Sequence, residues 1–261
     1  MKPALVILGA TGTVGRGVVA AAVAAGRSVI AVSRQWRELR ALRTAHAGAD
    51  LAIVRGSVAD DASSAQLAAA LAALNRPIGS IVVSICGDCE KGRVLDHPAD
   101  ALRRMLEQNV LAHASAARAL LPLLADAGGS YLLIGGPGAE QPWSGYGHRS
   151  IVAASLRMLA RVLHEEARAL PVRVQLLAID APVSTDANRE HACPSWPTPE
   201  AIGVRTLRLV DQLEPVPARA IVRYPGPAEQ PPVARESSPR GEVRALLDAV
   251  LSPTLPKEAL Q

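Results

Sequence analysis

Three glycines near the N-terminus, Gly9, Gly12 and Gly15, are spaced so that they could build a binding site for a phosphate. They follow a short apolar run at 4–8 and open an amphipathic stretch at 15–25, so the pattern predicts a turn between a buried strand and a helix. Such a turn lets the backbone approach a pyrophosphate, and the first N–H groups of the helix point at the anion. The spacing G-x-x-G-x-x-G therefore predicts a dinucleotide site, with glycines needed only for packing as the alternative.

The end of the second predicted strand, at 28–32, indicates which dinucleotide binds. A site that prefers NAD usually has an acidic residue about 20 residues after the glycines, where it holds the ribose 2′-hydroxyl. This chain has Ser33 and Arg34 instead, and a guanidinium binds a 2′-phosphate that a carboxylate would repel. We therefore expect NADP(H) as the cofactor; the alternative is that Arg34 only ends the strand at the surface.

Two small groups of thiol and imidazole side chains lie farther along the chain. Cys86 and Cys89 form a C-x-x-C pair, which in other contexts marks a dithiol or half of a zinc site, and His191 and Cys193 could complete such a site. The H-x-C spacing is short for a structural zinc clip. We predict no metal and interpret the four as ordinary loop or buried residues, with a dithiol and a zinc site as the alternatives.

Short apolar runs alternate with longer amphipathic stretches along most of the chain. The predicted strands are 4–8, 28–32, 51–54, 81–85, 131–134, 172–179 and 220–224. The predicted helices are 15–25, 38–46, 62–74, 99–124, 147–170 and 199–213. This alternation predicts an α/β fold, a Rossmann-like doubly wound parallel sheet in a single domain. We place the domain at 1–225, followed at 226–261 by a Pro-rich loop, a short helix at 242–251 and a tail.

Composition excludes several classes of function. The net charge is +4, the basic residues are scattered, and 2% of the residues are aromatic, so we expect no nucleic-acid partner. The first apolar run is too short and glycine-rich for a membrane span or a signal peptide. Three cysteines make no secreted disulfide framework, which predicts a cytoplasmic protein. Only Lys2, Lys91 and Lys257 among the 28 basic residues are lysines.

Further segments match positions of one enzyme family. Ser84-Ile85-Cys86-Gly87 follows the fourth strand, Asn109 lies in the long predicted helix at 99–124, and Val183 and Thr185 follow the sixth strand. With the glycine turn, these residues resemble the short-chain dehydrogenase/reductase family over about 5–224. In that family the four positions read Asn-Asn-Ala-Gly, and the Val and Thr belong to Pro-Gly-x-Val-x-Thr, which holds the nicotinamide carboxamide. Ser57, beside Val58, stands where the family commonly has an Asp that contacts adenine.

The resemblance also implies two catalytic residues, Tyr146 and Asn109. In the family, Tyr-x-x-x-Lys opens the helix after the fifth strand; the Tyr hydroxyl protonates a carbonyl oxygen and the Lys lowers its pKa. Here Ser150 stands in the place of the Lys, and glycine stands where a family Ser ends the fifth strand. The sequence leaves open whether Arg149 or His148 replaces the Lys. The cofactor-binding residues implied by the turn, the strand ends and the resemblance are Gly9, Thr11, Gly12, Thr13, Val14, Gly15, Ser33, Arg34, Ser57, Val58, Ser84, Cys86, Gly87, Val183 and Thr185.

Three functions are compatible with this pattern. The first, which we expect, is an NADP(H)-dependent oxidoreductase that acts on a small carbonyl or alcohol substrate. The second is a regulatory or scaffold protein that binds NADP(H) without hydride transfer. The third is a non-redox lyase, isomerase or cyclase on the same fold. In many family members the helices at 99–124 and 147–170 pair between subunits, so a homodimer or homotetramer is compatible with the sequence.

Overall fold

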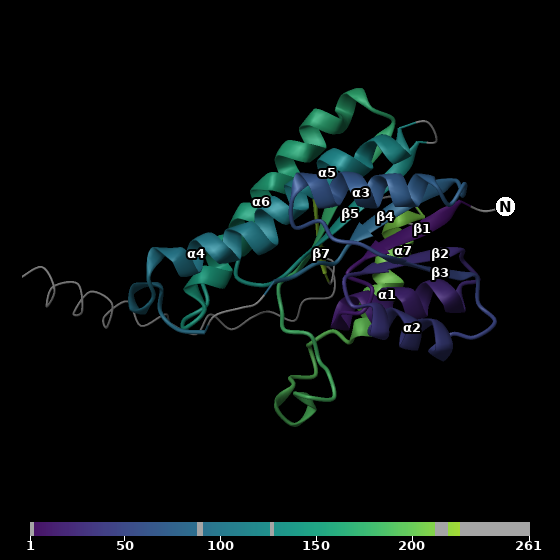
Figure 1. Cartoon of the computed structure of the whole chain (residues 1–261). Coiled ribbons are helices and arrows are strands. Elements are labelled where there is room, and N and C mark those ends of the chain that lie inside the picture. The colour runs from purple at the N-terminus through teal and green to yellow at the C-terminus, as the bar shows by residue number, and fades with distance from the viewer. Residues whose placement is uncertain (1–2, 88–90, 126–127, 212–218, 225–261) are drawn as a thin grey trace, which may run out of the picture. The chain divides into compact units, whose positions relative to one another are not determined.

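A single parallel sheet organises the chain (Figure 1). The computed structural model describes residues 3–87, 91–125, 128–211 and 219–224; Cys89 and the predicted helix at 242–251 lie outside them. The strand order is β3-β2-β1-β4-β5-β6-β7, and every pairing is parallel. The strands are β1 (Ala4–Leu8), β2 (Val29–Ser33), β3 (Leu51–Arg55), β4 (Ile78–Val83), β5 (Gly129–Gly135), β6 (Val172–Ile179) and β7 (Ile221–Tyr224). The predicted doubly wound fold is confirmed.

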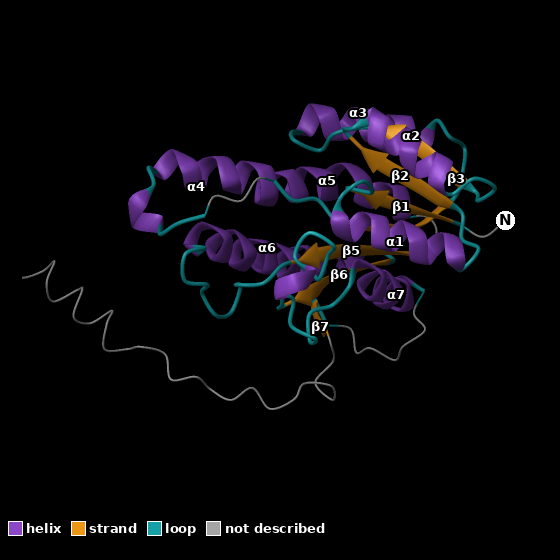
Figure 2. Ribbon diagram, turned by 90° about the horizontal axis from the view of Figure 1, so that it is seen from below, coloured by secondary structure: helices purple, strands orange, loops and turns teal. Residues whose placement is uncertain are grey.

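Helices cover both faces of the sheet, as the view in Figure 2 shows. One face packs against α1 (Thr13–Ala24), α2 (Trp36–Ala45) and α7 (Pro199–Val210). The other face packs against α3 (Asp61–Ala72), α5 (Ala112–Leu120) and α6 (Gly147–Glu166), and α4 (Ala99–Leu106) leads into α5. In β1, Val6 and Leu8 belong to one core and Leu5 and Ile7 to the other. A strand buried on both faces needs apolar residues at every position, which is why these strands read as continuous apolar runs.

The helix predicted at 99–124 contains a break in its hydrogen-bond pattern. α4 ends at Leu106, a π-helical turn runs over Glu107–Leu111, and α5 follows directly. The side-chain amide of Asn109 in this turn donates to the carbonyl of Met105 at 2.8 Å. The last turn, Leu121–Leu124, is a 3₁₀-helix with Pro122 near its start, where proline lacks the N–H that would continue the α-helix. π-helical turns such as Glu107–Leu111 often mark functional positions.

Several element boundaries differ from the prediction by one or more residues, those of β4 and α6 among them. β4 runs over Ile78–Val83 rather than 81–85, because pairing with β1 begins where the N–H of Ala4 donates to the carbonyl of Pro77. The glycine inside this strand, Gly79, packs against Pro3, which hid the start of the strand from an apolar pattern. α6 ends at Glu166, and a 3₁₀ turn finishes the stretch predicted as one helix to residue 170.

Helices α1 and α7 cross in close backbone contact. A Cβ atom at Gly17 would lie 2.1 Å from the carbonyl oxygen of Pro199, and one at Gly203 would lie 2.3 Å from that of Gly17. Arg27, after α1, also pairs with Asp211, after α7. The helix that follows the glycine turn is therefore fixed along its length to a helix near the end of the described chain.

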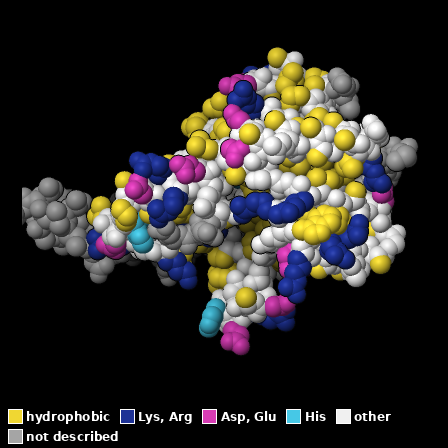
Figure 3. Space-filling model, in the orientation of Figure 1, with side chains coloured by type: hydrophobic (Ala, Val, Ile, Leu, Met, Phe, Trp, Pro, Cys, Tyr) yellow, Lys and Arg dark blue, Asp and Glu magenta, His cyan; other side chains and the backbone are white. Residues whose placement is uncertain are grey.

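The sheet order sets where a ligand would bind. The chain crosses from β1 to β2 and β3 on one side, and to β4 and the later strands on the other, so β1 and β4 form the switch point. In open α/β sheets, ligands bind outside the carboxyl ends of the strands at such a point. In the described part of the chain, no helix has the length and apolar character that a membrane span requires. On the face in Figure 3, basic and acidic side chains are interspersed.

Candidate active site

The turn after β1 contains glycines of two kinds. Gly9 has φ +74°, and a Cβ atom there would lie 2.1 Å from the carbonyl oxygen of Ser84. A Cβ atom at Gly15 would lie 2.1 Å from the carbonyl oxygen of Gly9, so packing alone requires these two glycines. A Cβ atom at Gly12 would meet only that same oxygen, at 3.3 Å. Packing at position 12 is tight but less restrictive than at positions 9 and 15, whereas close approach of a bound group would require a glycine there.

The first turn of α1 fits an anion. Gly12 is the N-cap residue and has no side chain to cap the helix, and the first turn carries no acidic residue. The positive end of the helix dipole is therefore not offset by a carboxylate in that turn. Thr13 and Gly12 are exposed there, while Thr11 and Val14 are half-buried. These features match what a pyrophosphate needs, so the residues present fit a dinucleotide.

The end of β2 is tied to the glycine turn. The hydroxyls of Thr11 and Ser33 lie 2.7 Å apart, and Ser33 also accepts from the N–H of Gln35 at 3.2 Å. Arg34 is exposed and, within the described residues, forms no ion pair. The nearby carboxylate of Glu38 is paired with Arg16 at 2.6 Å. A cationic side chain thus stands beside the predicted ribose position.

One cavity of about 190 Å³ joins many of the predicted residues. It lies at the carboxyl ends of β4, β5 and β6 and reaches the first turn of α1. The predicted residues that line it are Val14, Ser84, Cys86, Gly87, Asn109 and Val183. Those outside its lining are Gly9, Thr11, Gly12, Thr13, Gly15, Ser33, Arg34, Ser57, Val58, Tyr146 and Thr185.

Three of those outer residues have clear structural roles. The hydroxyl of Ser57 accepts from the N–H of Ala59 at 3.2 Å in the loop after β3, and Val58 packs in the core. The N–H of Thr185 donates to the side chain of Asn188 at 2.7 Å, and Asn188 donates back to the carbonyl of Val183. The loop after β6 is therefore held in a defined turn next to the cavity.

Asn109 connects the π-helical turn with the loop after β4. Its side-chain oxygen accepts from the N–H of Gly87 at 2.9 Å, while its amide nitrogen bonds to Met105. A Cβ atom at Gly87 would collide with the side chain of Gln108, at 2.4 Å, so the glycine permits this close contact. Asn109 is buried, and both ends of its side chain are engaged within the protein. Asn109 thus forms part of the cavity wall.

Tyr146 lies at the N-cap of α6, outside the cavity lining. Its backbone angles, φ −137° and ψ 37°, are not helical, and its ring packs edge-to-face on Trp143 with centroids 5.8 Å apart. Trp143 itself lines the cavity, so Tyr146 stands one side chain away from it. The hydroxyl of Ser150, four residues on, accepts from the N–H of Trp143 at 3.0 Å and donates to the carbonyl of Tyr146. Ser150 thus fixes the loop that begins α6.

Arg149 is the charged residue that α6 presents to the cavity. Arg149, Val152, Ala153 and Leu156 all line it, at the spacing of one helix face. A Cβ atom at Gly136, which lies directly after β5, would be 3.6 Å from Nη2 of Arg149. The pairs four residues apart that line the cavity are therefore Arg149 with Ala153 and Val152 with Leu156, not Tyr146 with Ser150.

His113 is a cavity residue that the sequence reasoning did not select. It is buried one turn after Asn109, and its Nδ1 contacts the carbonyl oxygen of Asn109. Its Nε2 has no hydrogen-bond partner within the described part of the chain. Burial lowers the pKa of His113 to about 4, so the ring is neutral at pH 7. The four-residue spacing from Asn109 was the one signal available in the sequence.

A family model described as Enoyl-(Acyl carrier protein) reductase matches residues 9–194, which is most of the chain. The chain belongs to the short-chain dehydrogenase/reductase family. The match begins at Gly9 and includes the cavity and α6. The search of curated proteins found no match.

Solved structures of this family share the fold. A short-chain type dehydrogenase/reductase from Mycobacterium ulcerans has a TM-score of 0.77 and 20% identity, covering 86% of this chain and 88% of its own. The closed form of serine dehydrogenase complexed with NADP+ has a TM-score of 0.75 and 19% identity, with 90% and 99% covered. An NADPH-bound short chain oxidoreductase from Pseudomonas aeruginosa PAO1 is described as containing an atypical catalytic center. It has a TM-score of 0.73 and 20% identity, covering 85% of this chain and 95% of its own. These likenesses show the fold.

A cluster of ion pairs stands where the family pattern has Pro-Gly after the sixth strand. Arg157 of α6 is buried and contacts Glu140 at 2.5 Å and Asp180 at 2.8 Å. Arg223 of β7 also pairs with Glu140, and its hydrogen bond lowers the pKa of that carboxyl. The cluster joins the loop after β5, α6 and the ends of β6 and β7. It was not predicted, because its members are far apart in the sequence.

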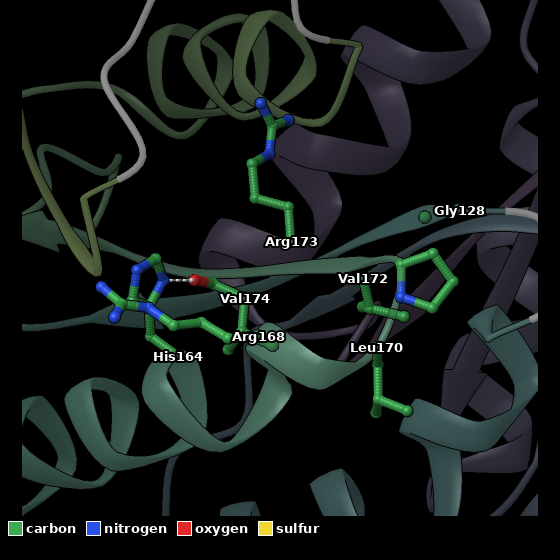
Figure 4. Close-up of a pocket in the computed structure, with 9 residues that line it drawn as sticks. Gly128, His164, Arg168, Leu170, Val172, Arg173 and Val174 are labelled. Atoms are coloured by element: carbon green, nitrogen blue, oxygen red, sulfur yellow. Dashed lines mark hydrogen bonds between the residues drawn. The ribbon is translucent and has the colours of Figure 1, made fainter.

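A larger pocket, of about 480 Å³, lies at the opposite end of the sheet (Figure 4). It is formed where β5 and β6 begin, and Nδ1 of His164 donates a hydrogen bond there to the carbonyl of Val174 at 2.8 Å. Figure 4 shows Arg173 pointing away from His164 and Arg168, and it bonds to Ser130 instead. We place the functional site at the carboxyl end, because the switch point and the family residues meet there.

Of the residues considered for a metal, Cys86, His191 and Cys193 lie in the described part of the chain and join no cluster of possible ligands there. Cys86 and Cys193 are exposed, and Cys86 lines the cavity. His191 lies in a 3₁₀ turn at Arg189–His191. Among the described residues, no three His, Cys, Asp or Glu side chains come together as metal ligands.

Proposed function

We propose that this family member is an NADP(H)-dependent oxidoreductase that acts on a small carbonyl or alcohol substrate. The observation that carries the proposal is Gly12, where packing restricts a side chain less than at Gly9 or Gly15 and which caps a helix without acidic residues in its first turn. The adjacent cavity connects that turn to Asn109 and to the loop after β6. The serine dehydrogenase complexed with NADP+ and the NADPH-bound oxidoreductase, which share the fold, support a nicotinamide dinucleotide.

The preference for NADP(H) rests on the end of β2. Ser33 is held by Thr11 and Gln35, and Arg34 is exposed beside it. The one carboxylate of the first turn of α2, Glu38, is already paired with Arg16. A 2′-phosphate would therefore find a guanidinium and a hydroxyl rather than a repelling charge.

Each group of residues has a separate task in the proposed mechanism. The turn Gly9–Gly15 and the first N–H groups of α1 hold the pyrophosphate, and Val183 and Thr185 border the nicotinamide end. A bound nicotinamide supplies or accepts a hydride. Asn109 keeps the loop at Gly87 in place, and Tyr146 is the proposed proton donor from the side of Trp143. Arg149 cannot be that donor, because a guanidinium does not lose its proton in proteins.

A second candidate function is a binding protein without hydride transfer. The observation that favours it is the pair of replacements at Gly136 and Ser150, which remove a hydroxyl and an ammonium from the family's machinery. Ser150 is used structurally, so it does not substitute for the ammonium. This candidate predicts NADPH binding without turnover of any carbonyl compound.

The test is a fluorescence titration with NADPH and NADH, followed by turnover assays with a panel of carbonyl compounds. Arg34→Ala is expected to weaken NADPH binding by about tenfold and to leave NADH binding nearly unchanged. Arg43→Ala is the matched control, since Arg43 is exposed on α2 and lies in its last turn. Equal losses for both dinucleotides would contradict the assignment of NADP(H). Turnover that is abolished by Tyr146→Phe would separate the enzyme from the binding protein.

The oligomeric state stays a prediction, and an apolar stripe on α6 supports a homodimer or homotetramer. Ile151, Met158 and Val162 are exposed on this helix, and Met158 is 55% exposed. Light scattering after gel filtration would give the mass, and Met158→Glu is expected to shift an oligomer to monomers. A wild-type mass of one chain would contradict the prediction.

A further inference from the structure

The cavity combines two polar groups that the proposed hydride transfer does not use. Arg149 lines it from α6, with its Nη2 close to the position that a side chain at Gly136 would occupy. His113 lines it from α5. The remaining lining is largely apolar, with Ile134, Leu156 and Ile179 among it. A small number of polar groups in an apolar cavity is the usual design of a site that orients one small ligand.

The described lining of this cavity contains one formally charged side chain, a guanidinium. Among its described lining residues, Arg149 is the only one with a formal charge at pH 7, and no Asp or Glu is present. A guanidinium carries a planar fork of donors that matches a carboxylate in two parallel hydrogen bonds. The missing side chain at Gly136 leaves space directly beside that fork. The site therefore attracts an anion with the size and planarity of a carboxylate.

The second group, His113, prefers a ligand that donates a hydrogen bond. Its Nδ1 contacts a carbonyl oxygen, which can only accept, so Nδ1 carries the proton. In the neutral ring Nε2 is then an acceptor, and it is buried without a partner in the described part of the chain. A buried acceptor of this kind is stabilised when a ligand hydroxyl donates to it.

We propose that the cavity binds a small hydroxy acid or the corresponding oxo acid, with its carboxylate on Arg149 and its hydroxyl directed to His113. The proposal rests on the proposed oxidoreductase function, since hydroxy and oxo acids are the two sides of one alcohol–carbonyl pair. The volume of about 190 Å³ is below the roughly 300 to 1,000 Å³ of pockets for larger ligands. A short acid fits this space.

The test compares acids with their uncharged esters on the full chain. Isothermal titration calorimetry would measure binding of 2-oxobutyrate, acetoacetate, 3-hydroxybutyrate and the three methyl esters, with and without NADPH. The acids are expected to bind at least about tenfold more tightly than the esters, because an ester offers one neutral acceptor where an acid offers a charged pair. Equal binding of acids and esters overturns the proposal.

Substitutions then assign the effect to residues. Arg149→Gln is expected to remove about tenfold or more of the acid affinity, and Arg149→Lys to restore part of it. Arg161→Gln removes the same charge from an exposed position of α6 and serves as the control. His113→Leu is expected to weaken 3-hydroxybutyrate more than acetoacetate. Unchanged acid affinity in Arg149→Gln, with the thermal midpoint retained, overturns the proposal.

The dinucleotide titration keeps this result separate from the proposed function. NADPH affinity is expected to stay the same in Arg149→Gln; a loss of NADPH affinity there overturns the proposal, because the guanidinium would then serve the cofactor. Wild-type chain that binds the acids but no dinucleotide contradicts the oxidoreductase and leaves the acid site in place. Wild-type chain that binds NADPH but no acid supports the cofactor site and overturns the acid site.

Discussion

The two halves of the candidate site differ in how they are built. At the glycine turn, the important atoms belong to the backbone: main-chain oxygens leave no room for a side chain at Gly9 and Gly15, and the helix N–H groups need no particular side chain. At the start of α6, the important atoms belong to side chains, and their identities differ from the family pattern. Gly136 and Ser150 illustrate this, since the hydroxyl and the ammonium of the pattern are absent there.

This difference explains which half of the candidate site is easier to recognise from the sequence. A backbone site leaves a spacing of glycines in the sequence, because few substitutions are compatible with the same turn. A side-chain site depends on which residues a helix turns toward the cavity, and one shift in the helix start changes all of them. Tyr146 remains in the non-helical N-cap, so the face presented to the cavity begins at Arg149.

The substitution that we expect to have the largest effect disrupts the glycine turn itself. Gly15→Ala places a Cβ atom 2.1 Å from the carbonyl oxygen of Gly9, and we expect it to destabilise the fold by more than about 3 kcal/mol. Gly12→Ala meets only an oxygen at 3.3 Å, so its stability should stay within about 1 kcal/mol of wild type while NADPH affinity falls. Urea unfolding and dinucleotide titration measure the two quantities. Equal destabilisation by both substitutions would contradict the division of the turn into packing and binding glycines.

Substitutions in the ion-pair cluster beside α6 test whether the stability of this second half of the candidate site, at the start of α6, depends on a buried charge. Arg157→Leu removes a buried cation between Glu140 and Asp180, and we expect a loss of about 3 kcal/mol. Arg223→Leu removes a cation that is half exposed and should cost less than about 1 kcal/mol. Both are measured by denaturant unfolding. A larger loss for Arg223→Leu would show that the outer contact, not the buried one, holds the strand ends.

The buried histidine gives the second half a pH dependence that the glycine turn lacks. The folded pKa of His113, about 4, lies below its ordinary value of 6.5, so the unfolded chain takes up a proton first as the pH falls. Its contribution to stability is complete above pH 6.5 and decreases toward pH 4; between pH 7 and 5 we expect a loss of about 2 kcal/mol. Urea unfolding at both pH values should show a smaller decrease in His113→Leu. The same decrease in both proteins would contradict the assignment.

The smallest effect concerns Ser150, the residue at the family's Lys position by sequence. Ser150→Ala removes hydrogen bonds to Trp143 and Tyr146, and we expect a loss of about 1 kcal/mol with unchanged NADPH affinity. A thermal melt and a dinucleotide titration are sufficient. Loss of NADPH affinity without loss of stability would show that Ser150 acts on the cofactor after all.

The strand and helix order was predictable because the central strands are buried on both faces and so read as apolar runs. The π-helical turn at Asn109 was not, since it depends on a side-chain bond to the loop at Gly87, which comes from another part of the chain. The presence of Arg149 and His113 in the cavity lining was hidden for the same reason. Each depends on which wall of the cavity a helix face meets, and no local pattern contains that information.

The close crossing of α1 and α7 has a consequence for synthesis of the protein. The chain leaves the ribosome from its N-terminus, so the glycine turn and α1 emerge well before Pro199 and Gly203. Until then, the flank of α1 that carries Gly17 has no helix against it. We expect nascent chains that stop before residue 199 to contain the complete glycine turn yet fail to bind a dinucleotide. The candidate site that comes first in the sequence would therefore be among the last to become able to bind its ligand.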